Sequence, residues 1–479
     1  MTDALTAHRE ANAKAADDIA ARVKQANVEF IYYQFVSING RVLAKVVPAA
    51  HVRRSLDKGV QFHGSAAADV AADRHGELFG GGIEAAEFVV MPDPETFQVL
   101  PWEPSVGRFL CRLYRRDDAH TDPGAPFGPD CRGNLRRQLE AFEARTGYEL
   151  RSGCEPEITW QGEGYDAVAR PGVSTAYHAG TLEQVREIYQ RVIRYAQALD
   201  IDMIEGDYED SGQIELNFMF DRADRTADRL ITYRQICVQV ARELGIGVTF
   251  MPKPTLGIMG NGCHHNLSLW RDGASAFADP GRRELHITET AQHALGGLLE
   301  HAAESMAVYA STVNSYKRYW DAGQFAPSRV DWGLDDRSRS VRISASGRLE
   351  LKLPDSIVNP YLSHALIAAA MADGLERRID PGPAPAAGKP GPERFAPLPL
   401  ILGDAVEAFA DSAFARAALG DELHALYRDF KRDEWARFCG ALTDWEFEMY
   451  RNWIPLAAAS TCWPKDAGPY AAATSTRCP

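Results

Sequence analysis

The chain has 479 residues, which is longer than one ordinary domain and indicates two or more. Its content of 45% hydrophobic and 25% charged residues is typical of a soluble globular protein. The net charge of −14 argues against a nucleic-acid partner.

Three features predict a cytoplasmic protein without a membrane anchor. The eight cysteines include no C-x-x-C pair, as expected for reduced, mostly buried thiols. The segment through Asn27 is rich in alanine and charge and lacks the apolar core of a signal peptide. No stretch approaches the roughly 18 apolar residues of a membrane span.

The N-terminal part is predicted to form a helical arm over residues 1–27 and a small β-rich domain over residues 28–120. Asn39-Gly40 separates two apolar runs, and this pair favours a type I′ turn and therefore a hairpin. Further strands are expected at Phe88–Met91 and Phe97–Leu100. The loop at residues 121–129 marks the boundary to a second domain, residues 121–479.

The second domain is predicted to mix helices and strands. Thr181 and Gln184 suggest a capping box for a helix that reaches Leu199. Seven prolines make residues 381–399 a surface loop, and the chain is expected to be helical to about Trp453. The other expected elements are a helix over 135–146, a strand around Glu155, a strand over 213–220 and a helix that ends at Gly245.

Two carboxylates in this domain indicate a metal site. Glu155 and Glu157 stand at positions i and i+2, so a strand places both on one face, with Pro156, Ile158 and Trp160 on the other. Adjacent like charges repel unless a cation lies between them, and a divalent metal fits that role. A solvated strand face is the alternative interpretation.

Three other segments offer acidic or imidazole ligands. They are Glu209 to Glu215, His264-His265, and Glu350. Lys352 follows Glu350 at position i+2. Each has an ordinary structural interpretation as well: an acidic turn, a structural histidine, and a surface ion pair. Their order along the chain is more informative than any one of them.

The order of these segments and the sequence around them resemble the glutamine synthetase family over about residues 28–455. The matching segments are Met91-Pro92-Asp93, Pro101-Trp102, Gly153-Cys154-Glu155-Pro156-Glu157, Gly212-Gln213-Ile214-Glu215, Phe250-Met251-Pro252-Lys253-Pro254, Gly260-Asn261-Gly262-Cys263-His264, Asn314-Ser315-Tyr316-Lys317-Arg318, Ala326-Pro327, Asp336 to Arg342, and Asn359-Pro360-Tyr361-Leu362.

The resemblance implies an α+β protein: an N-terminal β-grasp domain and a glutamine-synthetase-type catalytic domain with a curved antiparallel sheet. It also implies self-association into stacked rings, commonly dodecamers, with each active site between two subunits. Two or three Mg²⁺ or Mn²⁺ ions per site are expected, a choice that oxygen ligands with one imidazole suit. By the resemblance, Glu157, Glu209 and Glu215 hold one metal, and Glu155, His264 and Glu350 hold the other.

The implied reaction transfers the γ-phosphoryl group of ATP to L-glutamate, after which an amine attacks the acyl phosphate. Metals and arginines must offset the repulsion between two anionic substrates. The resemblance assigns Arg337 and Arg342 to the phosphates, and Arg318 and Gly260 to glutamate. Ser268 matches a nucleotide contact, with Asn266 beside it where many members have histidine.

Two departures change the expected amine. Phe325 stands where ammonia-using members have a flap glutamate, and His63 stands where they have an aspartate from the neighbouring subunit. An apolar amine would gain roughly 25 cal/mol per Å² of buried surface at a phenyl ring. An aniline-like amine needs no strong base, and a short alkylamine could use His63, since histidine titrates near neutrality.

Other departures leave alternatives open. Lys352 replaces an arginine that contacts glutamate, and Met259 replaces an asparagine. The segment before Glu215 is short, so Asp207 or Asp210 could take the role given to Glu209. Two alternatives compete with the amine ligase: a glutamine synthetase that uses ammonia, and a catalytically inactive homologue. A guanidine kinase is a more distant alternative because its motifs do not match this sequence.

Overall fold

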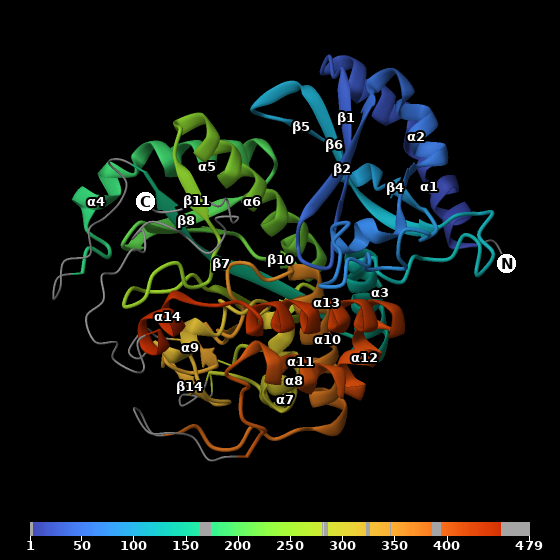
Figure 1. The fold of residues 1–479 in the computed structure, drawn as a ribbon. Helices are drawn as coiled ribbons and strands as arrows, with labels where there is room; N and C mark the ends of the chain where they lie inside the picture. The colour runs from blue at the N-terminus through green and yellow to red at the C-terminus, as the bar shows by residue number, and fades with distance from the viewer. Residues whose placement is uncertain are drawn as a thin grey trace, which may run out of the picture.

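Two β-sheets organise the protein (Figure 1). The computed structural model describes residues 3–162, 174–279, 281, 286–321, 326–344, 346–385 and 394–451. A six-stranded sheet belongs to the N-terminal part and a ten-stranded sheet to the remainder. The architecture is that of a mixed α and β protein with curved sheets, as the sequence predicts.

The first sheet runs in the order β2-β1-β6-β4-β3, with β5 paired to β6. Strands β1 and β6 are parallel, and the other pairs are antiparallel. Helix α1 forms where we expected the helical arm, and α2 lies beside it. The bounds are α1 Ala4–Gln25, β1 Phe30–Val36, β2 Val42–Pro48, α2 Val52–Lys58, β3 Val60–Phe62, β4 Phe88–Pro92, β5 Gln98–Leu100 and β6 Glu103–Arg115, with 3-10 turns at Ala49–His51, Gly64–Ala68 and Pro94–Thr96.

The β1–β2 hairpin forms, but its turn is not the predicted type I′. A type I′ turn needs positive φ at both Asn39 and Gly40, and only Gly40 has it, at 77°. The Gly40 N–H donates to the Ser37 carbonyl, and the Ser37 N–H donates to the Arg41 carbonyl. The connection is thus a longer turn closed by a left-handed glycine, because the pairing register places Val36 opposite Val42.

The second sheet runs in the order β14-β15-β16-β12-β7-β9-β8. It is antiparallel apart from β14 and β15, and β10, β11 and β13 attach to β7 or β12. Strand β7 is long and central, so it touches both halves of the sheet. The bounds are β7 Glu149–Gln161, β8 Met203–Asp210, β9 Gln213–Phe218, β10 Asp221–Arg222, β11 Gly247–Thr249, β12 Cys263–Arg271, β13 Ala274–Ser275, β14 Trp332–Leu334, β15 Val341–Ile343 and β16 Leu349–Leu351.

Helices lie on both sides of the strands of this sheet in Figure 1, with α5 and α6 above β7 and α7, α8 and α10 below it. Helix α10 is the central one and packs against α3, α6 and α7. Its buried apolar residues join the largest core cluster. The bounds are α3 Cys131–Thr146, α4 Ala179–Gln184, α5 Arg186–Ala198, α6 Ala223–Leu244, α7 Glu289–Glu300, α8 Ala302–Tyr309, α9 Lys317–Trp320, α10 Pro360–Arg377, α11 Leu402–Ala410, α12 Ala413–Leu419, α13 Asp421–Cys439 and α14 Asp444–Tyr450.

The predicted capping box at Thr181 is wrong. Helix α4 begins two residues earlier, so Thr181 lies inside it, and His178 is the N-cap residue without a side-chain bond. Val185 then separates α4 from α5, with φ −96° and ψ 12°. The capping pattern is short, so it also occurs where the preceding residues already continue the helix.

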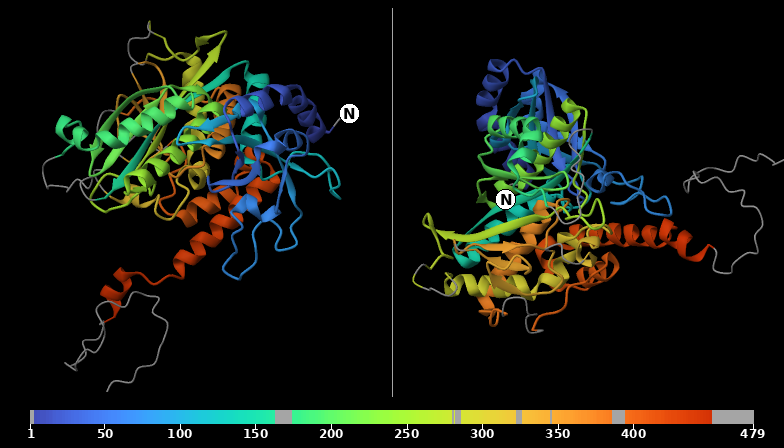
Figure 2. Two further views of the ribbon diagram at one scale, coloured as in Figure 1. Left: turned by 90° about the horizontal axis from the view of Figure 1, so that it is seen from above. Right: turned by 90° about the vertical axis from the view of Figure 1, so that its left-hand side faces the viewer.

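The C-terminal helices extend from the body of the protein (Figure 2). A genuine capping box, Thr443 with Glu446, begins α14, and that helix has no buried residue. The predicted end near Trp453 lies outside the described residues. Five of the six cysteines that the structure describes are buried, and Cys439 is exposed. Within the described part of the chain, no helix combines the length and apolar character needed to cross a bilayer.

Candidate active site

The pairing of the strands aligns the predicted ligand residues across the second sheet. His264 on β12 is directly opposite Glu155 on β7. On the other side of β7, Glu157 is opposite Glu215 on β9, and Asp207 on β8 is opposite Glu215 in turn. Side chains of directly opposed residues lie on the same face, so the sequence segments predicted to share a site do share one.

Three of the predicted ligands form a compact cluster. The His264 Nδ1 atom lies 3.4 Å from a Glu155 oxygen and 3.4 Å from a Glu350 oxygen. One ligand atom from each of the three residues lies within 4.8 Å of the others. Two carboxylates and one imidazole in this arrangement suit a divalent cation such as Mg²⁺ or Mn²⁺.

The second predicted set is less compact. The carboxylate oxygens of Glu157, Glu209 and Glu215 do not all lie within 4.8 Å of one another, although their side chains line one pocket. Burial and the neighbouring Glu157 and Asp207 carboxylates raise the pKa of Glu209 to about 7. Burial, with Glu155 and Glu157 nearby, raises the pKa of Glu215 well above its usual range. Uncompensated negative charge of this kind fits a bound cation.

The structure sets Asp210 apart from Glu209 and Asp207 among the three candidates for the third ligand of this set. Asp210 accepts hydrogen bonds from the Thr175 hydroxyl at 2.7 Å and its own neighbour's N–H, so its carboxylate is already engaged. Glu209 lies at a register irregularity of β8 and lines the pocket. Asp207 also lines the pocket, and its buried Oδ1 atom has no hydrogen-bond partner.

Glu155 has a different environment from the other carboxylates. Burial by itself would raise its pKa, but hydrogen bonds from His264 and Asn266 outweigh that effect and lower the pKa to about 2. The Asn266 amide donates to Glu155 at 2.7 Å, and Arg348 donates to Asn266 at 2.7 Å. Asn266 therefore orients a ligand carboxylate, a role that its position in the sequence did not indicate.

The predicted glutamate-binding residues lie together at one end of the pocket. Arg318 is 5% exposed, and its Nη1 atom has no partner among the described residues. A Cβ atom on Gly260 would lie 2.8 Å from the Arg318 side chain, and one on Gly262 would lie 2.8 Å from His264 Nε2. Only glycine therefore leaves the Arg318 and His264 side chains where they are. Lys352, 3% exposed, lines the same pocket.

The two predicted phosphate arginines differ. Arg337 lines the pocket and has no ion pair with a described carboxylate. Arg342 donates to Glu350 at 2.8 Å, and its Nε atom is buried without a partner. Arg342 therefore orients the Glu350 carboxylate, a predicted metal ligand, and its Nε donor is unused.

Two adjoining pockets share this face of the sheet. The first has a volume of about 680 Å³ and contains the carboxylates and arginines described above. The second, about 410 Å³, is lined by Asn266, Ser268, Phe220 and Trp270, and the two aromatic rings stack at 5.7 Å. Glu155 and Arg348 line both. The smaller pocket thus offers aromatic surface and the Ser268 hydroxyl beside the acidic cluster.

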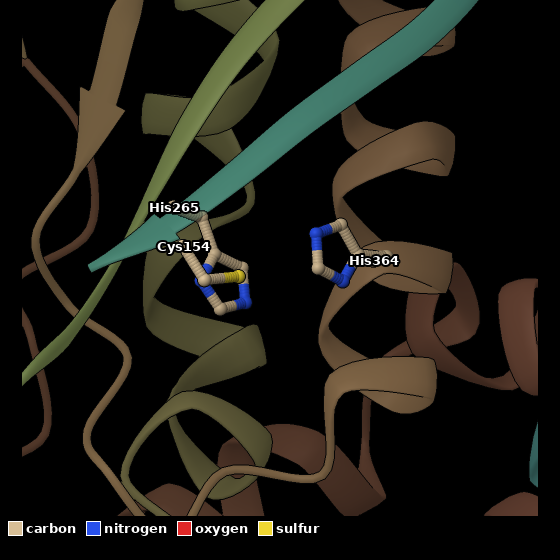
Figure 3. Close-up of side chains that lie close together, drawn as sticks. All are labelled: Cys154, His265 and His364. Atoms are coloured by element: carbon tan, nitrogen blue, oxygen red, sulfur yellow. The ribbon is translucent and has the colours of Figure 1, made fainter. Parts of the chain in front are cut away.

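A buried cluster supports the ligand strands from behind (Figure 3). Cys154 and His265 immediately neighbour the ligands Glu155 and His264 but point away from the pocket, toward His364 on α10. The two imidazoles stack at 4.5 Å, and their nitrogens bond Cys154, Ser363, the Pro360 carbonyl and Ser152. Every ring nitrogen thus has a protein partner, which is the pattern of a structural contact rather than of a second metal site.

One predicted residue is not brought into the pocket of its own chain, and another lies outside the described residues. His63 is not among the residues that line the pocket of its own chain; its ring nitrogens contact the Ser65 hydroxyl at 2.6 Å and the Ile83 carbonyl at 3.1 Å. Phe325 lies outside the described residues, although its neighbour Ala326 lines the pocket.

Sequence reasoning missed Tyr177 and Arg348. Tyr177 has φ 59° and lines the pocket, and the Glu209 carboxylate raises the pKa of its hydroxyl. The only sequence signal for Tyr177 was its position a few residues before a helix. The sequence signal for Arg348 was its proximity to Glu350, which follows two residues later in the chain.

Comparison with known proteins agrees with this geometry. Residues 129–450 match the family described as "Glutamine synthetase, catalytic domain". The chain belongs to the glutamine synthetase family. A glutamine synthetase of Thermus thermophilus is 32% identical over 90% of this chain and 98% of its own length. One of Pyrococcus abyssi is 31% identical over 88% of this chain and 96% of its own.

Solved structures extend the similarity to one branch of the glutamine synthetase family. A GmaS/ADP complex, GmaS being a gamma-glutamylmethylamide synthetase, has a TM-score of 0.80 and 32% identity, and covers 90% of this chain and 99% of its own. An apo GmaS has a TM-score of 0.78 at the same identity and coverage. The protein is thus a glutamine-synthetase-type, ATP-dependent carbon–nitrogen ligase.

Proposed function

We propose that this protein joins the γ-carboxylate of L-glutamate to a small hydrophobic primary amine, with ATP as the energy source and γ-glutamyl phosphate as the intermediate. Aniline-like amines and short alkylamines are the leading substrates, and such a reaction serves amine catabolism. One observation carries the proposal. The cluster of Glu155, His264 and Glu350 is intact, while the two carboxylates expected at the amine position are replaced.

The residues of the pocket divide the work of the first step. Arg318, buried and with an unused Nη1 donor, would hold a carboxylate of glutamate, and Gly260 leaves space beside it. Arg337 and the free Nε of Arg342 would contact the transferred phosphoryl group. Divalent cations, when bound at the carboxylates, supply positive charge that offsets the repulsion between the two anionic substrates.

The nucleotide base would occupy the smaller pocket. Phe220 and Trp270 offer aromatic surface there, and Ser268 offers a hydroxyl, which also accepts from the Trp270 N–H at 2.9 Å. From this position the phosphates would reach Arg348 and the ligand cluster, because Arg348 lines both pockets.

The amine would enter the catalytic pocket, which Ala326 lines. Met259, Ala176 and Ala326 contribute apolar surface to this pocket. Phe325, the residue before Ala326, would add a phenyl ring in place of a carboxylate. His63 of the neighbouring subunit would serve as the base for an alkylamine. The similarity to GmaS supports an amine rather than ammonia as the acceptor.

A panel of amines tests the substrate class. ADP release and the mass of the product would be measured with ammonium, methylamine, isopropylamine, aniline and putrescine. We expect kcat/KM for the best hydrophobic amine to exceed that for ammonium by at least roughly tenfold. Preference for ammonium or putrescine would contradict the proposal, and absence of amine-dependent ADP release would indicate an inactive homologue.

Substitution at Phe325 links the preference to this side chain. Phe325→Glu should lower kcat/KM for the hydrophobic amine and raise it for ammonium, since a carboxylate attracts a cation. Phe325→Leu is the matched control because it keeps apolar surface without a charge, and it should retain the preference.

Self-association into rings, with dodecamers as the expected form, is part of the same proposal. A site that uses His63 must obtain it from another chain, because His63 does not line the pocket of its own. The exposed apolar side chains of α14, described below, give such an assembly a contact surface.

A further inference from the structure

A second large pocket lies between the two sheets and is separate from the catalytic one. Its volume is about 920 Å³. The β1–β2 hairpin forms one wall, and α6 with β11 forms the opposite wall. Residues 250–252 close one end, and the same stretch continues to Gly260 of the catalytic pocket. The two pockets have no lining residue in common.

The charge of this pocket is unusual for an acidic protein. Three arginines line it, Arg41, Arg234 and Arg242, and its described lining residues include no aspartate or glutamate. Most arginines elsewhere pair with a carboxylate; for example, Arg132 lies 3.1 Å from Asp93 and 2.8 Å from Asp228. No ion pair joins Arg41, Arg234 or Arg242 to a carboxylate of the described residues. Positive charge is thus concentrated among the described lining residues, and the carboxylate that acts on Arg234, that of the buried Asp355, lies outside the lining.

Two buried donors at the α6 wall also lack acceptors. The Nη2 atom of Arg234 and the Nε2 atom of Gln235 are buried without a hydrogen-bond partner in the described structure. Gln235 does accept from Gln34 at 3.0 Å, across the pocket wall, so its position is fixed by the other sheet. Buried donors are nearly always satisfied in folded proteins, so two neighbouring exceptions beside a pocket indicate a missing acceptor.

The remaining wall is apolar. Trp102, Val238, Phe250 and Met251 line the pocket, and Val238 and Met251 are well exposed. A ligand that satisfies both halves of the lining needs an anionic group for the arginines and an apolar body for the aromatic and aliphatic side chains. A planar carboxylate matches the fork of a guanidinium in particular.

We propose that this pocket is a second ligand site that binds a small organic carboxylate with an apolar body. The carboxylate would be held by Arg234, with Arg41 and Arg242 nearer the entrance, and the body would lie against Trp102 and Phe250. This site does not depend on the amine specificity or on the metal ligands, because none of those residues lines it.

Fluorine NMR of the full-length protein in its native assembly tests the site. The probe is 4-(trifluoromethyl)benzoate, and its neutral amide is the matched control ligand. We expect saturable binding of the carboxylate that saturating ATP, Mg²⁺ and glutamate do not displace, and at least roughly tenfold weaker binding of the amide.

Variants assign the binding to the three arginines. Arg234→Met should weaken binding of the carboxylate probe by roughly tenfold or more. The double variant Arg41→Gln/Arg242→Gln should have the same effect, and it leaves the interior unchanged because both side chains are exposed. Arg54→Gln, an exposed arginine of α2 outside the pocket, should have no effect. The proposal is overturned by lack of saturable binding, by equal binding of the amide, by displacement with the substrates, or by full binding in both arginine variants.

Discussion

At the scale of single residues, the Glu155, His264 and Glu350 side chains form one cluster that is drawn from the three strands β7, β12 and β16. The alternation around Glu155 and Glu157 placed both on one face of a strand, and β7 has them there with Ile158 and Trp160 buried behind. What the sequence left open was the choice among Asp207, Glu209 and Asp210. That choice depends on a register irregularity in β8 and on hydrogen bonds from Thr175, which no local pattern encodes.

Gly262 leads to a prediction at this scale. A Cβ atom there would lie 2.8 Å from His264 Nε2 and 3.2 Å from both Arg318 Nη2 and Glu157 Oε2. Gly262→Ala should therefore lower kcat/KM by roughly tenfold or more, since a misplacement of about 1 Å at the reacting groups can cost about 100-fold. The free energy of unfolding, measured with urea, should change by less than about 1 kcal/mol.

The matched control is Gly247→Ala, where the added methyl group would make only ordinary contacts, the nearest at 3.4 Å. Steady-state kinetics of both variants provides the comparison. Near-normal activity of Gly262→Ala would show that the ligand and arginine positions tolerate displacement.

At the scale of elements, the order of helices and strands could be predicted, and the capping details could not. Thr181 carries a capping pattern inside α4, while the true caps, Asp130 and Thr288, lie at α3 and α7. Helix starts depend on which preceding residues are already helical, and tertiary packing decides that. The packing of α10 behind the ligand strands was likewise invisible, because His364 and Cys154 are 210 residues apart in the chain.

An ion pair between the buried Lys253 and the partly exposed Asp321 connects two loops beside the catalytic pocket. Lys253 Nζ lies 2.6 Å from Asp321 and also donates to the Ile258 carbonyl, while Gly257 N–H donates to Asp321 at 2.8 Å. Lys253→Met should free the loop that carries Met259 and Gly260. We expect the KM for glutamate to rise by roughly tenfold with little change in kcat.

Initial-rate measurements over a range of glutamate concentrations would check this expectation. Lys24→Met, on the exposed face of α1, is the control with the same change in side chain. An unchanged KM in the Lys253 variant would mean that the loop keeps its position without the ion pair.

The stacked histidines behind the ligand strands predict a pH effect on stability. Burial lowers the pKa of His364 to about 4, against 6.5 in the unfolded chain. The unfolded state therefore binds this proton first, so the stabilisation is complete above pH 6.5 and is lost as pH falls toward 4. Between pH 7 and pH 5 we expect His364 to account for about 2 kcal/mol of lost stability.

Urea unfolding at the two pH values, at one fixed protein concentration, measures this loss. His364→Gln removes the titrating group and should reduce the difference between the two pH values by about that amount. An identical pH dependence in the variant would assign the acid sensitivity to other groups.

At the scale of the whole molecule, the resemblance predicted the fold, whereas a candidate contact surface between chains is visible only in the structure. Trp445, Phe447 and Met449 of α14 are 58%, 48% and 51% exposed on helices that extend from the body (Figure 2). Such a group of apolar side chains indicates a contact with another chain. The double variant Trp445→Ser/Met449→Ser should therefore form smaller assemblies than the wild type.

Light scattering after size-exclusion chromatography would report the assembly, with Glu448→Gln on the same helix as the control. The same mass for the double variant and the wild type would mean that other surfaces hold the chains together.

The position of His63 outside the pocket of its own chain has a consequence for mixtures of variants. If each site takes His63 from one chain and Glu350 from the next, then two inactive chains, His63→Ala and Glu350→Gln, complement each other. Rings assembled from equal amounts should regain roughly one quarter of the wild-type activity, because one site in four receives both intact residues. If both residues served the same chain, the mixture would stay inactive, so one co-assembly experiment shows whether activity belongs to a subunit or to the boundary between two.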